Sequence, residues 1–314
     1  MEELGRVEDV RLRKGTTVRE LVEAYGRIHG FTAGSLYRAL EVLREGLAEA
    51  DLRFLSFTGN LVATGLRGLI AQLIDSKLFN VVITTCGTVD HDIARSLGGA
   101  YLKGDFDYDD VELWERGLHR LGNVLIPRDS YGPTVERYVR GLVERVSKVK
   151  SRWGVRELLQ EVGRDLKDDV NSILGAAYRA GVPVYVPGIV DGAFGTSLFV
   201  FSQFARLELD VLKDMKELSD LVFSSRKSLA LVLGGGISKH HTIWWNQFKG
   251  GLDYAVYITT AVEWDGSLSG ARTREAISWG KVGPRAKHVT VYGDATILLP
   301  IVVAYLLDTL QLPT

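Results

Sequence analysis

Lys281 is the residue of this sequence whose setting most favours covalent chemistry. It closes the segment DGSLSGARTREAISWGK at residues 265–281, which is too polar and glycine-rich for a core element yet places Trp279 two positions before the lysine. A lysine amine forms a Schiff base when a desolvated site keeps it neutral. A solvated surface lysine is the alternative, and spacing alone leaves both open.

Two histidines, His240 and His241, follow a triple glycine at the expected start of a helix. Adjacent side chains on a helix point about 100° apart, so the pair makes a poor two-ligand metal site. One ring that faces a pocket would shuttle protons near neutral pH. A capping or packing role is the alternative.

Acidic residues gather near two tryptophans in the same region. Glu263, Asp265 and Glu275 lie close in sequence to Trp264 and Trp279. Carboxylates beside an indole face suit a cationic amine ligand. A solvated acidic loop is the alternative.

The run Asp90-His91-Asp92 has the composition of a metal site, but its side chains diverge on a helix in the same way. We expect no metal there, and place the acids in the first turn of a helix, where the dipole favours negative charge. Cys86 is the single cysteine. It excludes an intramolecular disulfide and a cysteine-based structural zinc site.

Short apolar runs rich in Val, Ile and Tyr predict the strands that position these groups. They are residues 52–57, 81–85, 184–186, 229–233, 254–259 and 289–292. Amphipathic helical patterns separate the runs. This alternation predicts an α/β fold, with a doubly wound, mostly parallel sheet and helices on both faces.

The first 50 residues predict an N-terminal helical extension. Apolar residues recur at helical spacing over 18–25 and 36–47, and Thr17 and Ser35 are the expected N-caps. We therefore divide the chain into the extension, 1–50, and a single α/β domain, 51–314. The charged stretch 145–169 is expected to be an exposed helical insert.

Glycine, threonine, asparagine or aspartate follows each of the six expected strands. In an open α/β sheet the ligand lies outside the carboxyl ends of the strands, where helix N-termini favour phosphate. The pattern predicts a Rossmann-like nucleotide or dinucleotide site. The third glycine of G-x-G-x-x-G is missing after Gly234-Gly235-Gly236, so an NAD site here is not of the common type.

Bulk composition excludes several classes of function. The 314 residues carry a formal net charge of −1, which gives no global electrostatic case for nucleic acid or membrane binding. The most apolar stretch, 297–307, is interrupted by Pro300 and is too short to span a bilayer. The N-terminus has no apolar signal core. We expect a cytoplasmic protein.

Several motifs together resemble the deoxyhypusine synthase family. They are DYAVYITTAVEWDGSLSGARTREAISWGKVGPRAKHVTVYGD at 253–294, GGGISKHH at 234–241, PGIVDG at 187–192, TTCGTVDHDIA at 84–94 and FTGNLVATGLRG at 57–68. Their order and spacing are also similar, so the resemblance covers nearly the whole chain from about residue 50.

The resemblance implies a transferase of hypusine biosynthesis. Members of the family use NAD to dehydrogenate spermidine, release diaminopropane and hold the aminobutyl group as an imine on a lysine. They pass that group to a lysine of translation initiation factor 5A and reduce the new imine. They are homotetramers with active sites at a subunit interface.

The resemblance also assigns roles to residues. The imine lysine falls on Lys281, the active-site histidine on His240, the indole wall of the amine pocket on Trp279 and one amine-binding carboxylate on Glu275. The NAD-contacting positions fall on Asn60, Thr85, Cys86, Gly87, Asp90, Asp191, Gly234, Gly235, Thr260, Asp265, Ser267, Ser269 and Asp294.

Two positions depart from the eukaryotic pattern. Thr196 and Leu268 stand where eukaryotic members carry acids, and each lost carboxylate weakens binding of a multiply charged amine by about 1–3 kcal/mol if the pair is desolvated. Glu263 is one candidate to compensate, and another amine donor such as agmatine is an alternative to spermidine. The eukaryotic N-terminal extension is also shortened, so its gating role is not carried over.

Three other functions stay open. A homospermidine-type synthase would use the same chemistry on a free amine acceptor. An NAD-binding paralogue without transfer activity is a second alternative. An NAD-consuming deacylase is disfavoured, because one cysteine leaves no four-cysteine zinc site.

Overall fold

All six apolar runs form strands in the computed structural model, which describes residues 5–310. The strands are β1 (Leu52–Phe57), β2 (Val81–Ile83), β7 (Val184–Tyr185), β9 (Ser228–Leu233), β10 (Leu252–Thr259) and β11 (Val282–Tyr292). Every residue of β9 is buried, as expected of a strand covered on both faces. The predicted α/β fold with a mostly parallel sheet is confirmed.

Contacts divide the chain into two units. Unit 1 comprises Met1–Ser56 and Leu221–Thr314, and unit 2 comprises Phe57–Asp220. In unit 1 four strands form a sheet in the order β11-β10-β9-β1, and in unit 2 β2 pairs in parallel with β7. The helix α10 (Val211–Ser224) crosses the division.

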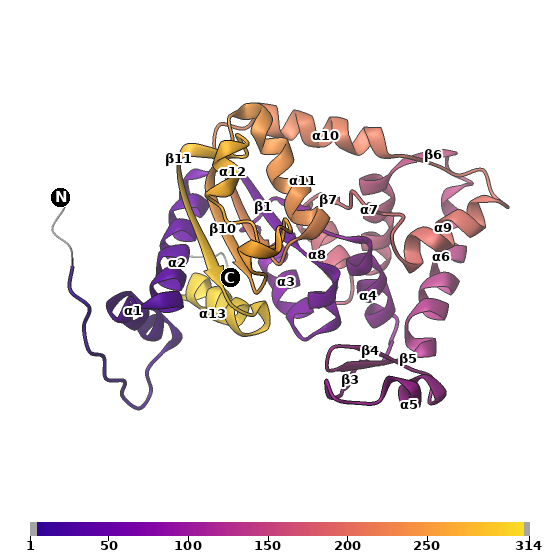
Figure 1. Cartoon of the computed structure of the whole chain (residues 1–314). Coiled ribbons are helices and arrows are strands. Elements are labelled where there is room, and N and C mark those ends of the chain that lie inside the picture. The colour runs from indigo at the N-terminus through magenta and orange to yellow at the C-terminus, as the bar shows by residue number, and fades with distance from the viewer. Residues whose placement is uncertain (1–4, 311–314) are drawn as a thin grey trace. The chain divides into compact units, whose positions relative to one another are not determined.

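Unit 1 contains both ends of the described chain. Its helices are α1 (Val18–Ile28), α2 (Phe31–Glu49), α11 (Gly236–Asn246), α12 (Glu275–Ser278) and α13 (Ala295–Thr309), with 3-10 turns η3 (Gln247–Lys249) and η4 (Glu263–Asp265). α2 packs along β11, β10 and β9, and α13 packs on α1 and α2 (Figure 1). The expected division at residue 50 stays a prediction.

Of the two predicted N-caps, Thr17 is confirmed and Ser35 is wrong. Thr17 caps α1 and forms a capping box with Glu20, in which each side chain bonds to the other residue's amide. Ser35 is not a cap, because α2 begins four residues earlier, after Gly30. His29 and Phe31 adopt positive φ angles at this junction, a turn that apolar spacing does not reveal.

β11 begins seven residues before the apolar run that predicted it. Its pairing with β10 runs in register from Tyr254 and Lys287 onward, but shifts between Leu252 and Tyr254. Gly283 and Pro284 lie in the shifted part. A bulge of this kind breaks the alternation of apolar and polar residues by which a strand is predicted.

Unit 2 surrounds β2 and β7 with helices. They are α3 (Leu66–Asp75), α4 (Cys86–Ser96), α5 (Asp110–Glu115), α6 (Gly132–Val146), α7 (Val155–Asp165), α8 (Ile173–Ala180) and α9 (Ala193–Ser202), with η1 (Gly59–Ala63) and η2 (Arg128–Ser130). Two small sheets were not predicted: antiparallel β3 (Leu102–Lys103), β5 (Val124–Pro127) and β4 (Leu118–Leu121), and the parallel pair β6 (Arg152–Gly154) and β8 (Glu208–Asp210).

The stretch 145–169 is helical but is not an exposed insert. α7 buries Leu158, Leu159 and Val162 and packs against α8. Its charged residues occupy the opposite face, as in an amphipathic helix. Among the described helices, none is long and apolar enough to cross a membrane.

Candidate active site

A short helix and a tight turn place Lys281 in unit 1. The Lys281 amide donates to the Ala276 carbonyl of α12 at 2.9 Å. Gly280 has a φ of 66°, a left-handed conformation that glycine adopts without strain. The Lys281 carbonyl then accepts from the Leu252 amide at 3.1 Å, which joins the turn to the start of β10. The backbone of the lysine is therefore fixed on both sides.

The side chain of Lys281 faces two indole rings. The residue is 7% exposed, so it is not a solvated surface lysine. Its Nζ lies 5.0 Å from the ring centroid of Trp279 and 5.7 Å from that of Trp244. Both distances are within the reach of a cation–π interaction. Sequence reasoning placed Trp279 here but missed Trp244, which comes from a different element.

His240 is positioned by the same indole. It lies one helical turn before Trp244 on α11, and the two rings stack with centroids 5.5 Å apart at an interplanar angle of 27°. Burial and the nearby charge of Lys281 lower the pKa of His240 below its ordinary value. A neutral imidazole at this position can accept a proton near pH 7.

His241 has a different environment from its neighbour. The Nε1 of Trp245 donates to its Nε2 at 3.1 Å, which makes that nitrogen an acceptor. Burial, with a smaller contribution from His240, lowers the pKa of His241 to about 4. The adjacent rings thus contact different tryptophans, and His241 stays neutral in a structural role.

Lys239 ties the loop before α12 to α11. Its Nζ donates to the carbonyls of Leu268 and Ala271, both at 2.7 Å, and lies 4.4 Å from the ring centroid of Tyr257. The residue is almost fully buried, and burial lowers its pKa to about 8, against an opposing effect of Glu275. Sequence reasoning gave Lys239 no role, although it lies within the KHH motif.

The expected dinucleotide residues of unit 1 follow the carboxyl ends of three strands. Gly234 and Gly235 come after β9, Thr260 after β10 and Asp294 after β11. A Cβ added to Gly235 would lie 2.2 Å from Oγ of Ser269, so only glycine fits there. The turn and the loop around 269 therefore approach each other closely at the start of α11.

Asp265, Glu275 and Asp294 are exposed. The carboxylate of Asp265 accepts from the Ser267 amide at 2.6 Å, and that of Asp294 caps α13 by accepting from the Thr296 amide at 2.8 Å. Glu275 is exposed at the first position of α12.

Glu263 does not stand free to bind an amine. Its carboxylate pairs with the guanidinium of Arg272, with Nε and Oε2 2.6 Å apart. The sequence suggested that Glu263 replaces the acids missing at Thr196 and Leu268. To bind an amine, Glu263 has to give up its ion pair with Arg272. Leu268 itself contributes its backbone carbonyl to Lys239.

Unit 2 brings together a second group of the expected dinucleotide residues. Oγ1 of Thr85 accepts from the Gly59 amide at 3.0 Å, and a Cβ on Gly59 would lie 2.6 Å from the carbonyl carbon of Gly87. The start of η1 thus touches the start of α4. Asn60 and Asp191 are exposed, one in η1 and the other before α9.

The expected first-turn position of Asp90 and Asp92 is wrong. No acid lies in the first turn of α4. The carboxylate of Asp90 instead accepts from the amides of Ala193 at 3.0 Å and Phe194 at 2.7 Å, and so caps α9.

Asp92 caps another helix in the same way. It accepts from the amides of Ile173 and Leu174 at the start of α8, at 3.1 Å and 2.8 Å. Both acids are fully buried. Asp90 therefore links α4 to α9, and Asp92 links α4 to α8. Any contact of Asp90 with a dinucleotide stays a prediction.

Cys86 is not a reactive thiol. It is buried at the first position of α4, with Sγ 3.9 Å from a carboxylate oxygen of Asp90. Burial and the charge of Asp90 raise the pKa of the thiol to about 12. Within residues 5–310, no group of three or more His, Cys, Asp or Glu side chains has the arrangement of a metal site.

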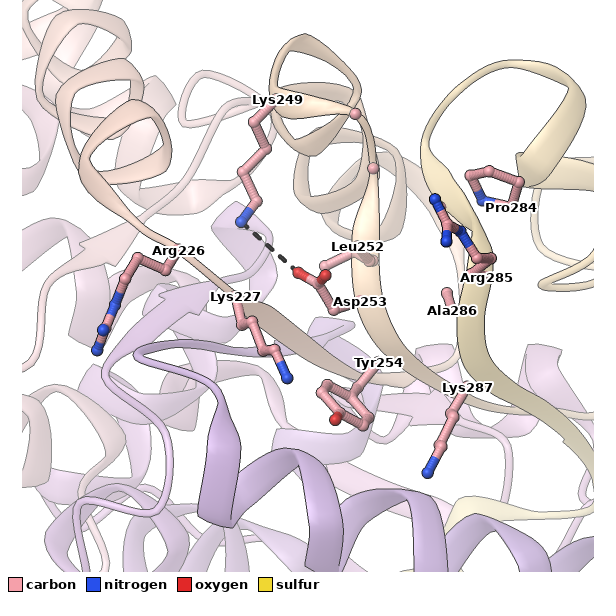
Figure 2. A pocket seen from close by; sticks show the side chains of 13 residues that line it. Arg226, Lys227, Lys249, Leu252, Asp253, Tyr254, Pro284, Arg285, Ala286 and Lys287 are labelled. Carbon is pink, nitrogen blue, oxygen red and sulfur yellow. Dashed lines mark ion pairs between the residues drawn. The ribbon is translucent and has the colours of Figure 1, made fainter.

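A hollow of about 340 Å³ lies at the amino ends of the strands of unit 1 (Figure 2). It is lined by Arg226, Lys227, Lys249, Gly250, Gly251, Leu252, Asp253, Tyr254, Gly283, Pro284, Arg285, Ala286 and Lys287. Lys249 pairs with Asp253 at 3.8 Å and Lys227 with Glu49 at 2.5 Å, so much of its positive charge is already balanced. None of the expected active-site residues lines it.

Comparison with known proteins points to one family. The family model described as deoxyhypusine synthase matches residues 20–306. The chain is 60% identical to a protein of Ignicoccus hospitalis named probable deoxyhypusine synthase, over 97% of this chain and 96% of that protein. It is also 60% identical to a protein of the same name from Aeropyrum pernix, over 97% of this chain and 98% of the relative.

A solved structure shares the fold. A crystal structure from Entamoeba histolytica whose title carries the deoxyhypusine synthase name superposes with a TM-score of 0.68, at 19% identity, over 96% of each chain. At this identity the likeness bears on the fold alone.

Proposed function

Because this chain belongs to the deoxyhypusine synthase family, we propose that it transfers the aminobutyl group of spermidine to a lysine of translation initiation factor 5A. The group passes through an imine on Lys281, with NAD as cofactor. The observation that carries the proposal is the buried Lys281 amine beside two indoles and His240. A cytoplasmic homotetramer is part of the proposal, since family members assemble in that way.

Two glycine turns support NAD as the cofactor, one in each unit. At Gly235 and at Gly59 a side chain would collide with a neighbouring loop, so each turn requires a glycine. The helices that follow, α11 and α4, have no hydrogen bond from an N-cap side chain, and their N-termini favour a negatively charged group. Bound NAD would accept a hydride from the carbon next to the amine nitrogen and return it at the end.

His240 supplies the base for the first step. The secondary nitrogen of spermidine is an ammonium in water, and it must give a proton to a neutral acceptor before the neighbouring carbon can lose a hydride. The lowered pKa of His240 keeps its ring neutral near pH 7. Its stacking on Trp244 fixes the ring plane, so the base is oriented before the amine arrives.

Lys281 then forms and breaks the covalent bonds. Nζ has to lose its proton before it bonds to the oxidised carbon. The bond from that carbon to diaminopropane then breaks, and the leaving nitrogen takes a proton from Nζ. The lysine of the protein acceptor attacks the same carbon, and the bond to Lys281 breaks. Hydride return to the new imine leaves a secondary amine, with no net redox change. Burial of Lys281 protects the imine from water.

The test is to incubate the protein with NAD, spermidine and the factor, and to measure the mass of the factor by mass spectrometry. A mass increase equal to one aminobutyl group is expected. An unmodified factor with native, NAD-binding enzyme would refute the proposal. Putrescine in place of the factor tests a homospermidine-type activity, and agmatine in place of spermidine tests the alternative donor.

A further inference from the structure

Trp244 is held in a row of rings on one face of α11 and η3. His240 stacks on one side of it, and the ring of Phe248 meets it edge-on, with centroids 5.8 Å apart at 86°. These residues follow one another at intervals of four, which places them on one face of a helix. The indole is therefore oriented by its neighbours, although it is 39% exposed.

Trp244 and Trp279 approach Lys281 from different elements. Trp244 lies on α11 and Trp279 in the turn after α12, and Nζ lies within 6 Å of both ring centroids. A positive charge at Nζ thus faces two π systems. Trp279 is 66% exposed, so both rings can also be reached by a bound ligand.

Two of the nearby carboxylates already have partners in the chain. Glu263 is paired with Arg272, and Asp265 accepts from an amide in its own loop. Leu268 offers no charge at all. Apart from the exposed carboxylate of Glu275, the recognition groups for a cation in this stretch of the chain are indole faces.

We propose that Trp244 is a specificity residue of this site, which together with Trp279 stabilises the positive charge that the imine places on Nζ of Lys281. The inference rests on the proposed function and names its substrate class: a slender aliphatic amine whose chain lies against the indoles. When the deprotonated Nζ bonds to the protonated C=N carbon, one of its two hydrogens goes to the leaving diaminopropane nitrogen. The other stays on the new C=N nitrogen, which is therefore cationic. That charge forms at Nζ, within 6 Å of both ring centroids.

The experiment compares Trp244→Leu, Trp244→Phe and the control Trp114→Leu. Trp114 is an exposed indole of unit 2 whose own cation partner is Arg128. For each protein with NAD bound, spermidine affinity is measured by calorimetry, and the imine on Lys281 is trapped with borohydride and quantified by mass. NAD affinity and thermal unfolding are recorded to show that each variant is folded.

Trp244→Leu should weaken spermidine binding and lower the trapped adduct by about 2- to 30-fold, the range of a partly desolvated cation–π contact. Trp244→Phe should restore part of the loss, because a phenyl face binds a cation more weakly than an indole. Trp114→Leu should match the wild type.

The outcomes separate this inference from the proposed function. If the wild type forms the adduct and Trp244→Leu equals it in affinity and yield, the inference is overturned and the transfer activity stands. If the wild type forms no adduct but Trp244→Leu still loses amine affinity, the aromatic recognition stands and the transfer activity fails. A Trp244→Phe variant as weak as Trp244→Leu would also count against recognition by a ring face.

Discussion

At the scale of single residues, the proposed chemistry depends on the side chains that surround the amine of Lys281. Lys281 is buried against two indoles, and its charge is, after burial, the second cause of the lowered pKa of His240. A lysine amine has to lose its proton before it can act as a nucleophile. Two predictions concern these side chains directly.

Replacing Lys281 by alanine should abolish the borohydride-trapped adduct and all transfer, because no other group supplies the bond-forming nitrogen. NAD affinity should stay within about threefold, since a residue that forms the covalent intermediate acts after cofactor binding. Intact-protein mass and NAD titration measure the two effects. Lys287→Ala, which removes an exposed lysine paired with Glu45, is the control. An adduct that persists in Lys281→Ala would assign the imine to another lysine.

The rate of transfer should depend on pH through His240. Burial and the charge of Lys281 lower its pKa, with His241 next to it on the same helix. The ring therefore stays neutral below the ordinary histidine value, and kcat/KM should fall only as the pH drops through that lowered pKa. Its acid limb should lie below about 6.5.

The matching variant is His240→Gln. It should lose that acid limb and slow transfer by about 10²- to 10⁴-fold, the usual contribution of a general base. A pH–rate profile of kcat/KM for both proteins measures this. An acid limb at or above the ordinary value, or one unchanged in His240→Gln, contradicts the assignment.

At the scale of elements, α11 organises the site through helical spacing. His240 with Trp244 and His241 with Trp245 are each four residues apart, so adjacent histidines belong to two different aromatic stripes. The preceding residue, Lys239, bonds the loop that leads to α12. One helix thus fixes the base, an indole and the loop that carries the nucleophile.

Gly235 should not tolerate a side chain. In Gly235→Ala the new Cβ would lie 2.2 Å from Oγ and 2.5 Å from Cα of Ser269, so the turn and the loop must separate. We expect NAD affinity to fall at least about tenfold, the effect of losing about 1.4 kcal/mol of binding energy. Fluorescence titration with NADH measures it.

Gly65→Ala is the matched control. Nothing lies within 4 Å of the Cβ position at Gly65, and its φ of −68° suits alanine. It should bind NADH as the wild type does. If both variants bind NADH equally, the turn after β9 does not contribute to the dinucleotide site.

At the scale of the whole molecule, stability depends on buried ion pairs as well as on apolar packing. In unit 2, Arg67 bonds to Asp92 at 2.7 Å and to Asp169 at 2.6 Å, and its side chain is 5% exposed. Asp92 in turn caps α8. One guanidinium therefore links α3, α4 and the segment before α8.

Arg67→Leu should lower the free energy of unfolding of unit 2 by about 3–5 kcal/mol, because it leaves the charge of Asp92 buried without its cation. Arg140→Leu removes an exposed pair with Glu144 and should cost at most about 0.5 kcal/mol. Urea unfolding followed by circular dichroism compares them. Equal shifts in the two variants would show that the buried network contributes no more than a surface pair.

Local patterns made much of the fold predictable. The apolar runs are strands because β-branched residues favour extended, buried backbone wherever they occur, and Thr17 caps α1 through bonds to residues three positions away. The bulge in β11 and the small sheets around β5 and β6 escaped prediction. The bulge depends on irregular backbone, and β6 pairs with a strand distant in sequence. The hairpin of β4 and β5 turns at Gly122-Asn123, a local signal that was missed.

The same distinction applies to the side chains of the site. The sequence by itself determined the family, through its motifs, and the places of the strands, through their apolar runs. It also offered Lys281 and His240 as candidates, whose alternatives residue type and spacing left open. Only the tertiary structure decided that Trp244 meets Lys281 and that Glu263 is already paired. It also decided that Asp90 caps a helix 103 residues away. Contacts between distant segments depend on how whole elements pack, and no local pattern encodes which side chains that packing brings together.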